Sequence, residues 1–369
     1  MRKREMVIKE MSSAMQYTFE ITMAGCGTNC MHCSVDGGPS RNMSFSDYIK
    51  CLKKLKPILD PLEGDISVTP GNEPLNHPEA RKILSYTHEM MPKYYPDQPF
   101  DTPTTGVVFM RRKDKEEIID VLPKIGANEV MLTLHGNEKH HNEIVRNPLG
   151  YQSIVDTAQY FHSQGFKIVY NLMVSKYLIE DWDTVVSFLK EHHSSKVHFT
   201  IPSYLPIERL NIYQKIRAEY DDCMKLKGRL CEMGIDEEKF FEKVESNCEK
   251  TIAQRFKDGI DYKRAEKEYP NWVFFNISQD LDIYYGNAGA RTKLLGNLLK
   301  ESEEELYQRI IAQKANYSYS AYYDVDKLPA IQSILEKVQP LQTNYVYSRE
   351  SDCLYWWFNQ CNIPDILLK

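Results

Sequence analysis

Residues 25–33 read Gly-Cys-Gly-Thr-Asn-Cys-Met-His-Cys, and they place three thiols, those of Cys26, Cys30 and Cys33, within eight positions. The segment directly follows Gln16–Met23, a run whose β-branched and aromatic residues predict a strand. In parallel β/α folds, the loops at the carboxyl ends of the strands carry the active site. A cysteine loop in this position therefore predicts a metal centre within an active site.

The number of cysteines indicates which metal centre this is. Thiolates are soft ligands that select zinc, copper(I) or iron–sulfur clusters. The chain has no second Cys-x2-Cys pair and no His-x3-His pair that could complete a structural zinc site, and clusters that only transfer electrons have four cysteine ligands. Three cysteines would leave one metal position open to a cofactor or substrate. The alternatives are a zinc-binding module with remote ligands, a non-catalytic iron–sulfur protein, and three packed thiols.

The Cys-x3-Cys-x2-Cys spacing resembles the hallmark of the radical S-adenosylmethionine (radical SAM) superfamily. The resemblance implies that Cys26, Cys30 and Cys33 bind three irons of one [4Fe–4S] cluster and that S-adenosylmethionine binds the fourth. It also implies reductive cleavage of S-adenosylmethionine to a 5′-deoxyadenosyl radical, which abstracts hydrogen from a substrate. His32 stands where relatives carry a large aromatic residue near the adenine, so we expect it to contact the cofactor.

Three further segments support the resemblance. Residues 71–74, Gly-Asn-Glu-Pro, follow the predicted strand Asp65–Thr69 and are similar to the family's GGEP element, which contacts the methionyl amino group. Leu132–Gly136 resembles the segment that places a Ser or Thr near the cofactor carboxylate, and the segment Tyr170–Val174 contains an Asn found near the ribose in several subfamilies. The expected cofactor contacts are Gly71, Asn72, Glu73, Pro74, Thr133 and Asn171. An Asn within a strand is, however, more often a structural hydrogen-bonding group.

Histidines follow the fourth predicted strand, at His135, His140 and His141. Because the loop between them is rich in charge, we expect these side chains to be solvated. The loop follows the carboxyl end of a strand, so one of them could line a substrate pocket.

The first two hundred residues alternate short β-type runs with amphipathic segments, which is typical of β/α units around a parallel sheet. Ser44–Leu59 is the clearest predicted helix. The resemblance implies an α/β fold, a (β/α)6 partial TIM barrel over residues 16–206, after an N-terminal segment of residues 1–15. The six predicted strands are Gln16–Met23, Asp65–Thr69, Thr104–Met110, Glu129–Leu134, Lys167–Val174 and Lys196–Ile201.

The remaining residues, 207–369, form a predicted α+β extension. Ile207–Met233 and Asp236–Lys257 are predicted to be two long helices, followed by β structure over Trp272–Tyr285 and a helix over Ser302–Gln313. Together with Leu295–Leu298, the β segment resembles the SPASM or Twitch extension of radical SAM enzymes, but without the cysteines that bind auxiliary clusters.

Two late cysteines, Cys353 and Cys361, flank the aromatic segment Leu354–Phe358. If this segment covers the barrel mouth, either thiol could donate a hydrogen atom to a substrate radical, as in radical SAM peptide epimerases. The alternative is an aromatic plug with a packing role.

Composition narrows the possible partners. The net charge of −6 arises from interspersed acids and bases, and the N-terminus lacks a secretory apolar region. We expect a cytoplasmic protein with no nucleic-acid or membrane partner and with an external electron donor such as flavodoxin or ferredoxin.

The substrate is predicted to be either a small natural-product precursor or a peptide. Dehydrogenation, epimerisation and decarboxylation all remain open as the reaction. Because only about fifteen residues precede the predicted barrel, we expect a peptide-modifying enzyme of this kind to act with a separate leader-binding partner.

Overall fold

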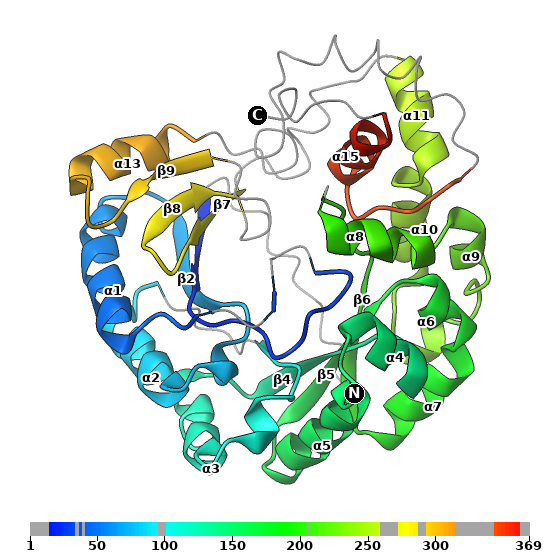
Figure 1. Ribbon diagram of the computed structural model, residues 1–369, viewed down its shortest axis with the longest axis horizontal. Coiled ribbons are helices and arrows are strands. Elements are labelled where there is room, and N and C mark those ends of the chain that lie inside the picture. The colour runs from blue at the N-terminus through cyan, green and yellow to red at the C-terminus, as the bar shows by residue number, and fades with distance from the viewer. Residues whose placement is uncertain are drawn as a thin grey trace, which may run out of the picture.

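The structure is a computed structural model, which describes residues 15–33, 37–38, 41–94, 101–205, 207–258, 272–286, 293–313 and 343–361. Two sheets organise it, with strand orders β2-β1-β7-β8-β9 and β3-β4-β5-β6 (Figure 1). All pairings among the first six strands are parallel, which confirms the α/β partial barrel. The six strands are β1 (Gln16–Thr22), β2 (Asp65–Gly71), β3 (Asp101–Pro103), β4 (Glu129–Leu134), β5 (Lys167–Met173) and β6 (Ser194–Thr200).

The extension adds strands to the first sheet. β7 (Trp272–Ile277) runs parallel to β1, and β8 (Asp282–Tyr285) and β9 (Lys293–Asn297) follow it in antiparallel order. β7 lies on the side of β1 away from β2. The extension therefore continues the barrel sheet, although the sequence alternation suggests a separate unit.

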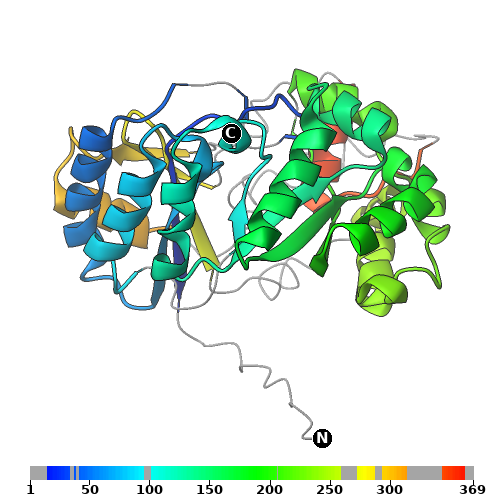
Figure 2. The ribbon, with the colours of Figure 1, turned by 90° about the horizontal axis from the view of Figure 1, so that it is seen from below.

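The barrel helices α1 to α7 lie along the outside of the two sheets (Figures 1 and 2). Those of the barrel are α1 (Phe45–Leu59), α2 (Ala80–Met90), α3 (Lys115–Ile119), α4 (Glu138–Val145), α5 (Gly150–Ser163), α6 (Lys176–Glu180) and α7 (Trp182–Glu191). Those of the extension are α8 (Glu208–Tyr213), α9 (Tyr220–Met224), α10 (Glu237–Ser246), α11 (Glu249–Lys257), α13 (Glu303–Ile311) and α15 (Glu350–Gln360). Among the described residues, no helix is both long and apolar enough to cross a membrane.

Helix α1 shows how the sequence pattern becomes structure. The Ser44 hydroxyl caps its first turn by accepting a hydrogen bond from the Asp47 amide at 3.1 Å. Its apolar residues recur every three or four positions, so one face is buried against the first sheet. The buried residues of this face are Tyr48, Cys51, Leu52, Leu55, Ile58 and Leu59.

Successive side chains of strand β4 point alternately to the hydrophobic core and to the interior of the barrel. Val130, Leu132 and Leu134 are buried in the core beneath the helices. Met131 and Thr133 point the opposite way and line a cavity inside the barrel. Strand β4 thus presents Met131 and Thr133 to the interior, where a ligand can bind.

Three sequence predictions are wrong. The predicted strand Thr104–Met110 contains instead a loop and a short 3-10 helix, Phe109–Arg111, and β3 precedes it. The predicted long helix Ile207–Met233 is broken, because Arg217 and Glu219 have extended backbones and Glu219 pairs with Tyr345. The second long helix divides into α10 and α11 at Cys248, whose backbone pairs with Val346.

A buried arginine joins the last described segment to the barrel. Arg217 donates hydrogen bonds to the carbonyls of Pro202, Ser203 and Val346 at 2.6, 2.8 and 3.2 Å. Its guanidinium also lies 4.7 Å from the centre of the Tyr347 ring. The cation is thereby satisfied without solvent, and it fixes residues 346–347 beside the end of β6.

Asp352 gives this segment a pH dependence. Burial raises its pKa to about 6, and its Oδ2 atom has no hydrogen-bond partner. An acid whose pKa is higher in the folded than in the unfolded state destabilises the fold increasingly as pH rises above its unfolded pKa. We expect Asp352→Asn to raise the free energy of unfolding by about 3 kcal/mol at pH 8 and by roughly half of that at pH 5.

Thermal unfolding of both proteins between pH 5 and pH 8 measures this difference. A stability gain that does not change with pH would contradict the burial of an ionisable carboxyl at this position.

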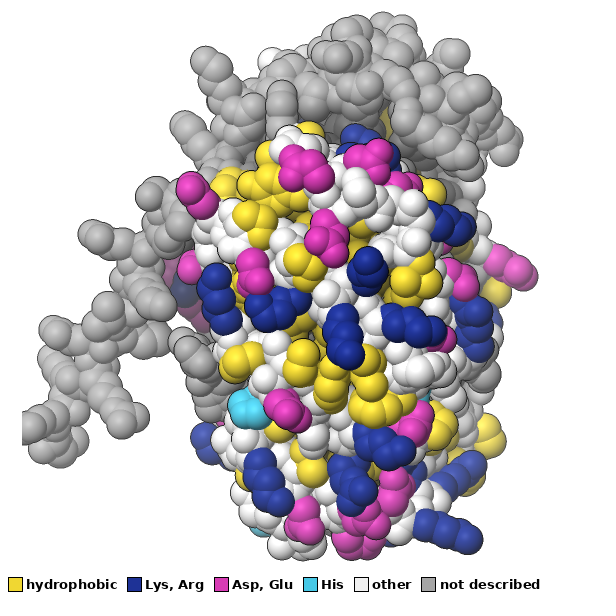
Figure 3. Space-filling model, turned by 90° about the vertical axis from the view of Figure 1, so that its left-hand side faces the viewer, with side chains coloured by type: hydrophobic (Ala, Val, Ile, Leu, Met, Phe, Trp, Pro, Cys, Tyr) yellow, Lys and Arg dark blue, Asp and Glu magenta, His cyan; other side chains and the backbone are white. Residues whose placement is uncertain are grey.

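The face formed by α1 and α13 carries interspersed basic and acidic side chains, rather than one sign of charge (Figure 3). Lys54 on α1 and Glu303 on α13 lie 4.0 Å apart. Both are exposed, so the pair contributes little to stability.

Candidate functional site

A cavity of about 180 Å³ lies where the loops after β1, β2 and β4 meet. All three cysteines of the predicted cluster loop line it. The other lining residues used below are Thr28, His32, Gly37, Asn72, Glu73, Thr104, Thr105, Met131, Thr133, His135 and His141. The structure thus brings together residues that lie more than one hundred positions apart in the sequence.

The three thiols are free and half-buried. The Thr28 hydroxyl lies 3.2 Å from both Cys26 Sγ and Cys30 Sγ, so it joins two of the predicted ligands. The Gly37 amide donates a hydrogen bond to Cys33 Sγ at 3.1 Å. A Cβ atom on Gly37 would lie 2.7 Å from that sulfur, so only glycine allows this close approach.

Backbone contacts hold the cysteine loop at both ends. The Cys26 amide donates to the carbonyl of Gly38, and the Met31 amide donates to the carbonyl of Ile144 at the end of α4, both at 2.9 Å. The Arg209 guanidinium donates to the carbonyl of Gly37. The loop is therefore fixed to elements from three parts of the chain.

Glu73 is the buried acid of the cavity. Its Oε1 atom accepts hydrogen bonds from the Thr104 hydroxyl and the Thr105 amide, both at 2.7 Å, and from the Thr105 hydroxyl at 2.9 Å. Its Oε2 atom accepts a hydrogen bond from the Cys26 thiol at 3.0 Å. One carboxylate thus joins the loop after β1 to the loop after β3.

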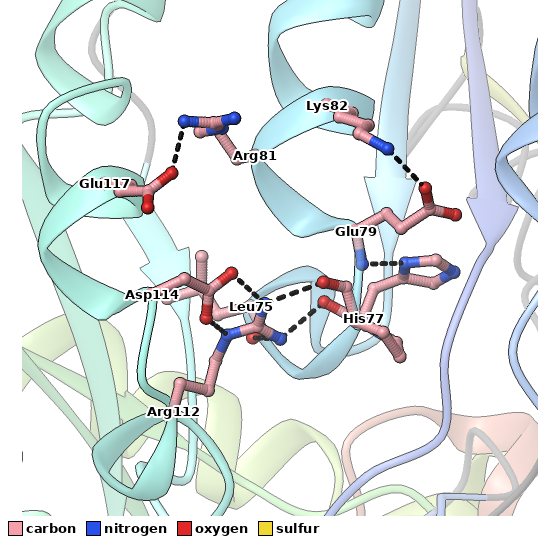
Figure 4. Close-up of polar contacts among 9 residues, drawn as sticks. Leu75, His77, Glu79, Arg81, Lys82, Arg112, Asp114 and Glu117 are labelled. Atoms are coloured by element: carbon pink, nitrogen blue, oxygen red, sulfur yellow. Dashed lines mark hydrogen bonds and ion pairs between the residues drawn. The ribbon is translucent and has the colours of Figure 1, made fainter.

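The turn that carries Asn72 and Glu73 is shaped by a left-handed residue and an arginine. Asn72 has φ +60°, a conformation that Asn adopts more readily than most residues, which explains how it replaces the second Gly of GGEP. Arg112 then fixes the following turn, since its guanidinium donates to the carbonyls of His77 and Pro78 at 2.6 and 2.9 Å and pairs with Asp114 (Figure 4).

The donor set fits a [4Fe–4S] cluster. Burial raises the pKa of Cys30 to about 12, and burial together with the Glu73 carboxylate raises the pKa of Cys26. Both groups are therefore thiols without a metal, whereas metal ligands are thiolates. The hydrogen bond from Cys26 to Glu73 consequently belongs to the cluster-free protein. Three sulfurs line one cavity, that of Cys33 beside Gly37, and Asn72 Oδ1 is buried and unpartnered in the same lining, so the site offers three ligands and a polar group.

Three histidine rings also line the cavity. The His32 and His135 ring centres lie 4.5 Å apart, and those of His135 and His141 lie 5.3 Å apart. Burial lowers the pKa of His32 to about 4, that of His141 to about 3, and that of His135 well below its usual value. The expectation that His135 and His141 are solvated is wrong, since both are buried and line the cavity. That a histidine of this loop lines a substrate pocket stays a prediction.

Asp181 holds the loop between β4 and α4. Its carboxylate accepts hydrogen bonds from the Asn137 amide and side chain, both at 2.8 Å, and lies 2.7 Å from His140 Nδ1. Gly136, at φ +140°, makes room for it, because a Cβ atom there would lie 2.6 Å from Asp181 Oδ2. His140 thus faces this network, while its neighbour His141 lines the cavity.

The predicted cofactor contacts divide into two groups. His32, Asn72, Glu73 and Thr133 are in the cavity lining, whereas Gly71, Pro74 and Asn171 are not. Asn171 accepts a hydrogen bond from the Thr200 hydroxyl at 2.6 Å. A contact between any of these side chains and the cofactor stays a prediction.

Behind the lining, a Cβ atom on Gly71 would overlap the side chain of Glu20. Burial raises the pKa of that Glu20 carboxyl to about 7. Pro74, next to Glu73, is itself buried at the start of a short 3-10 turn.

The late cysteines lie outside the cavity lining. Cys353 is fully buried in α15 among residues of the first hydrophobic core, and Cys361 follows the last turn of that helix. Hydrogen donation by either thiol stays a prediction. The packing alternative agrees with the burial of Cys353.

Sequence reasoning missed Thr28, Thr104 and Thr105. Thr28 lies between Cys26 and Cys30 in the sequence. Thr104 and Thr105 are in a loop and not in the predicted strand, so the hydroxyls of both can donate hydrogen bonds to Glu73. Pro103 and Gly106, which flank them, are the signals that indicate a loop here.

Comparisons with known proteins agree with this geometry. Residues 21–189 match the radical SAM superfamily. Among solved structures, SuiB of Streptococcus suis bound to S-adenosylmethionine matches with 17% identity and a TM-score of 0.51, over 80% of this chain and 66% of SuiB. The chain thus spans slightly less than two thirds of that protein.

A second match extends over nearly the whole chain. anSMEcpe with bound AdoMet and the Cp18Cys peptide matches with 13% identity and a TM-score of 0.52, over 95% of this chain and 98% of anSMEcpe. At these identities the likeness concerns the fold. No curated protein sequence matches the chain.

The cysteine loop after β1, the parallel partial barrel and the family match all point to the same class of protein. Its cofactors are accordingly a [4Fe–4S] cluster and S-adenosylmethionine. Residues 21–189, which contain the cysteine loop and every residue of the cavity lining, form a domain of the radical SAM superfamily.

Proposed function

We propose that this enzyme abstracts a hydrogen atom from a peptide and so starts a modification of that peptide. The observation that carries the proposal is that three cysteine thiols, two of them joined by the Thr28 hydroxyl, line the same cavity as Glu73 and two buried histidines. This arrangement places the predicted cluster ligands beside space for a cofactor and a substrate group.

When bound, the cluster supplies one electron that cleaves S-adenosylmethionine to methionine and a 5′-deoxyadenosyl radical, and this radical takes a hydrogen atom from the substrate. The protein's own residues bind and shield the reactants. We assign Cys26, Cys30 and Cys33 to the cluster, and His32, Asn72, Glu73 and Thr133 to contacts with S-adenosylmethionine.

Structural neighbours support a peptide over a small molecule. SuiB has been solved with its precursor peptide SuiA, in a structure matched at 16% identity with a TM-score of 0.50. anSMEcpe has been solved with the Cp18Cys peptide. We propose that residues 207–369 form the equivalent of a SPASM-type extension that binds no auxiliary cluster, since the sequence has no cysteine between Cys248 and Cys353. An external flavodoxin or ferredoxin supplies the electron.

A deuterium-transfer assay tests the proposal. Extracts of the encoding organism grown in heavy water are incubated without oxygen with the cluster-loaded enzyme, dithionite and S-adenosylmethionine. We expect deuterium in the 5′-deoxyadenosine, and we expect this label to disappear when the extract is first digested with a broad protease. Label that survives digestion would assign the enzyme to a small-molecule substrate instead.

A further inference from the structure

Three histidines of the cavity lining, His32, His135 and His141, carry a ring nitrogen that no protein group satisfies. His32 is assigned above to the cofactor, which leaves His135 and His141. Each side chain is only 1% exposed, and Nδ1 of each is buried without a hydrogen-bond partner. Buried polar atoms are nearly always paired in folded proteins, so an unpaired atom that lines a cavity indicates a missing ligand. Here two such atoms lie on neighbouring rings, whose centres are 5.3 Å apart.

Both rings are held in place before any ligand binds. His135 directly follows β4, and Asp181 fixes Asn137, two residues further on, through the hydrogen bonds described above. His141 lies on the buried face of α4 and meets the Tyr151 ring edge-on at 5.9 Å between centres. The pair is therefore preorganised, which lowers the entropic cost of binding.

The charge of the cavity restricts what these rings can bind. Among the described residues that line it there is no Lys or Arg, and its one acidic side chain, Glu73, is already hydrogen-bonded to Thr104 and Thr105. An anionic group would lose its water without meeting a cationic side chain of the protein. An uncharged polar group carries no such penalty.

A neutral imidazole has one nitrogen that donates and one that accepts, and either tautomer can form. A primary amide offers donors and an acceptor together, so it can satisfy two imidazoles whichever tautomers they adopt. A thioether or an alkyl group would leave both nitrogens unpaired.

We propose that His135 and His141 recognise an uncharged amide side chain, that of Gln or Asn, in the substrate. This inference rests on the proposed peptide-modifying function, and it makes the two histidines determinants of specificity. The low pKa values of both rings agree with it, since neither ring becomes charged near neutral pH.

Three capped tripeptides of nearly equal shape test the proposal: acetyl-Gly-Gln-Gly-amide, acetyl-Gly-Met-Gly-amide and acetyl-Gly-Glu-Gly-amide. Their affinities are measured by saturation-transfer NMR on the cluster-loaded enzyme with S-adenosylmethionine. We expect the Gln peptide to bind about three- to tenfold more tightly than the Met and Glu peptides, the value of one or two hydrogen bonds to an uncharged group.

Variants test whether His135 and His141 cause the preference for the Gln peptide. The double variant His135→Leu, His141→Leu is expected to bind the Gln and Met peptides equally. The variant His135→Asn, His141→Asn keeps a polar atom near each Nδ1 position, and it is expected to retain most of the preference. His162→Leu, a change at an exposed histidine outside the cavity lining, is the matched control and should behave as wild type. Iron content and thermal unfolding verify that each variant is folded.

A wild-type preference for the Met or Glu peptide, or a Gln preference that survives in the double Leu variant, would overturn the inference. If 5′-deoxyadenosine still forms, neither outcome counts against the proposed function. Conversely, an enzyme that never cleaves S-adenosylmethionine refutes the proposed function, whatever it binds.

Discussion

Cys26→Ala, Cys30→Ala and Cys33→Ala are each expected to lose the iron–sulfur cluster. The reconstituted wild type should contain about four iron and four sulfide per chain, the stoichiometry of a cubane cluster, and each variant only a small fraction of this. The physical reason is that three thiolates hold the cluster. No other described cysteine lines the cavity and could replace a lost ligand.

Iron and sulfide analysis after anaerobic reconstitution measures this effect. Cys231→Ala is the matched control, because Cys231 is exposed and lies outside the cavity lining. It should bind the full cluster. A single cavity variant that kept wild-type iron would show that its thiol is not a ligand, and the assignment of the loop would have to be revised.

Glu73→Ala is expected to produce the second large effect. Removing the carboxylate leaves the hydroxyls of Thr104 and Thr105 and the Thr105 amide without their acceptor. Hydrogen bonds to a buried charged group contribute about 1.5–3 kcal/mol each, so we expect a loss on the order of 3 kcal/mol in the free energy of unfolding. The loop after β3 would also separate from the cysteine loop, and S-adenosylmethionine cleavage should fall at least tenfold.

Glu73→Gln separates these two consequences. The amide oxygen of Gln still accepts hydrogen bonds from the loop after β3, so most of the stability should remain. The negative charge is lost, so any contribution of the carboxylate to binding the cationic cofactor is lost with it. Thermal unfolding and 5′-deoxyadenosine formation are measured for both variants. Unchanged unfolding of Glu73→Ala would contradict the described role of this side chain.

The local chemistry of the sequence predicts the barrel strands well where apolar residues alternate. The observed bounds of five strands differ from the predicted bounds by no more than two residues at either end. These strands are β1, β2, β4, β5 and β6. The strand predicted at Thr104–Met110 fails although its β-branched residues favour a strand. Hydrogen bonds from Thr104 and Thr105 to the distant Glu73 keep this segment in a loop, and no local pattern reports such a contact.

The broken helices have a similar cause. Glu219 and Cys248 have apolar neighbours at helical spacing, but their backbones pair with Tyr345 and Val346, about one hundred residues away or more. Tertiary pairing overrides helix propensity here.

The residues of the candidate site also fall into those that the local sequence predicts and those whose positions depend on distant contacts. The cysteine loop and the Asn72–Glu73 turn are predictable, because their spacing along the chain is itself the signal. The burial of His141 could also have been found, because it shares helical spacing with the apolar residues Ile144 and Val145 on the buried face of α4. Its approach to His135 depends on how α4 packs after β4, which spacing alone does not report.

Formation of 5′-deoxyadenosine is the most direct test of the central claim. The protein is purified without oxygen, reconstituted, reduced with dithionite and supplied with S-adenosylmethionine, beside the Cys26, Cys30 and Cys33 triple Ala variant. We predict 5′-deoxyadenosine and methionine from the wild type and neither from the variant. A wild-type protein that binds a complete cluster but never cleaves S-adenosylmethionine, or that binds zinc in place of iron, would contradict the claim.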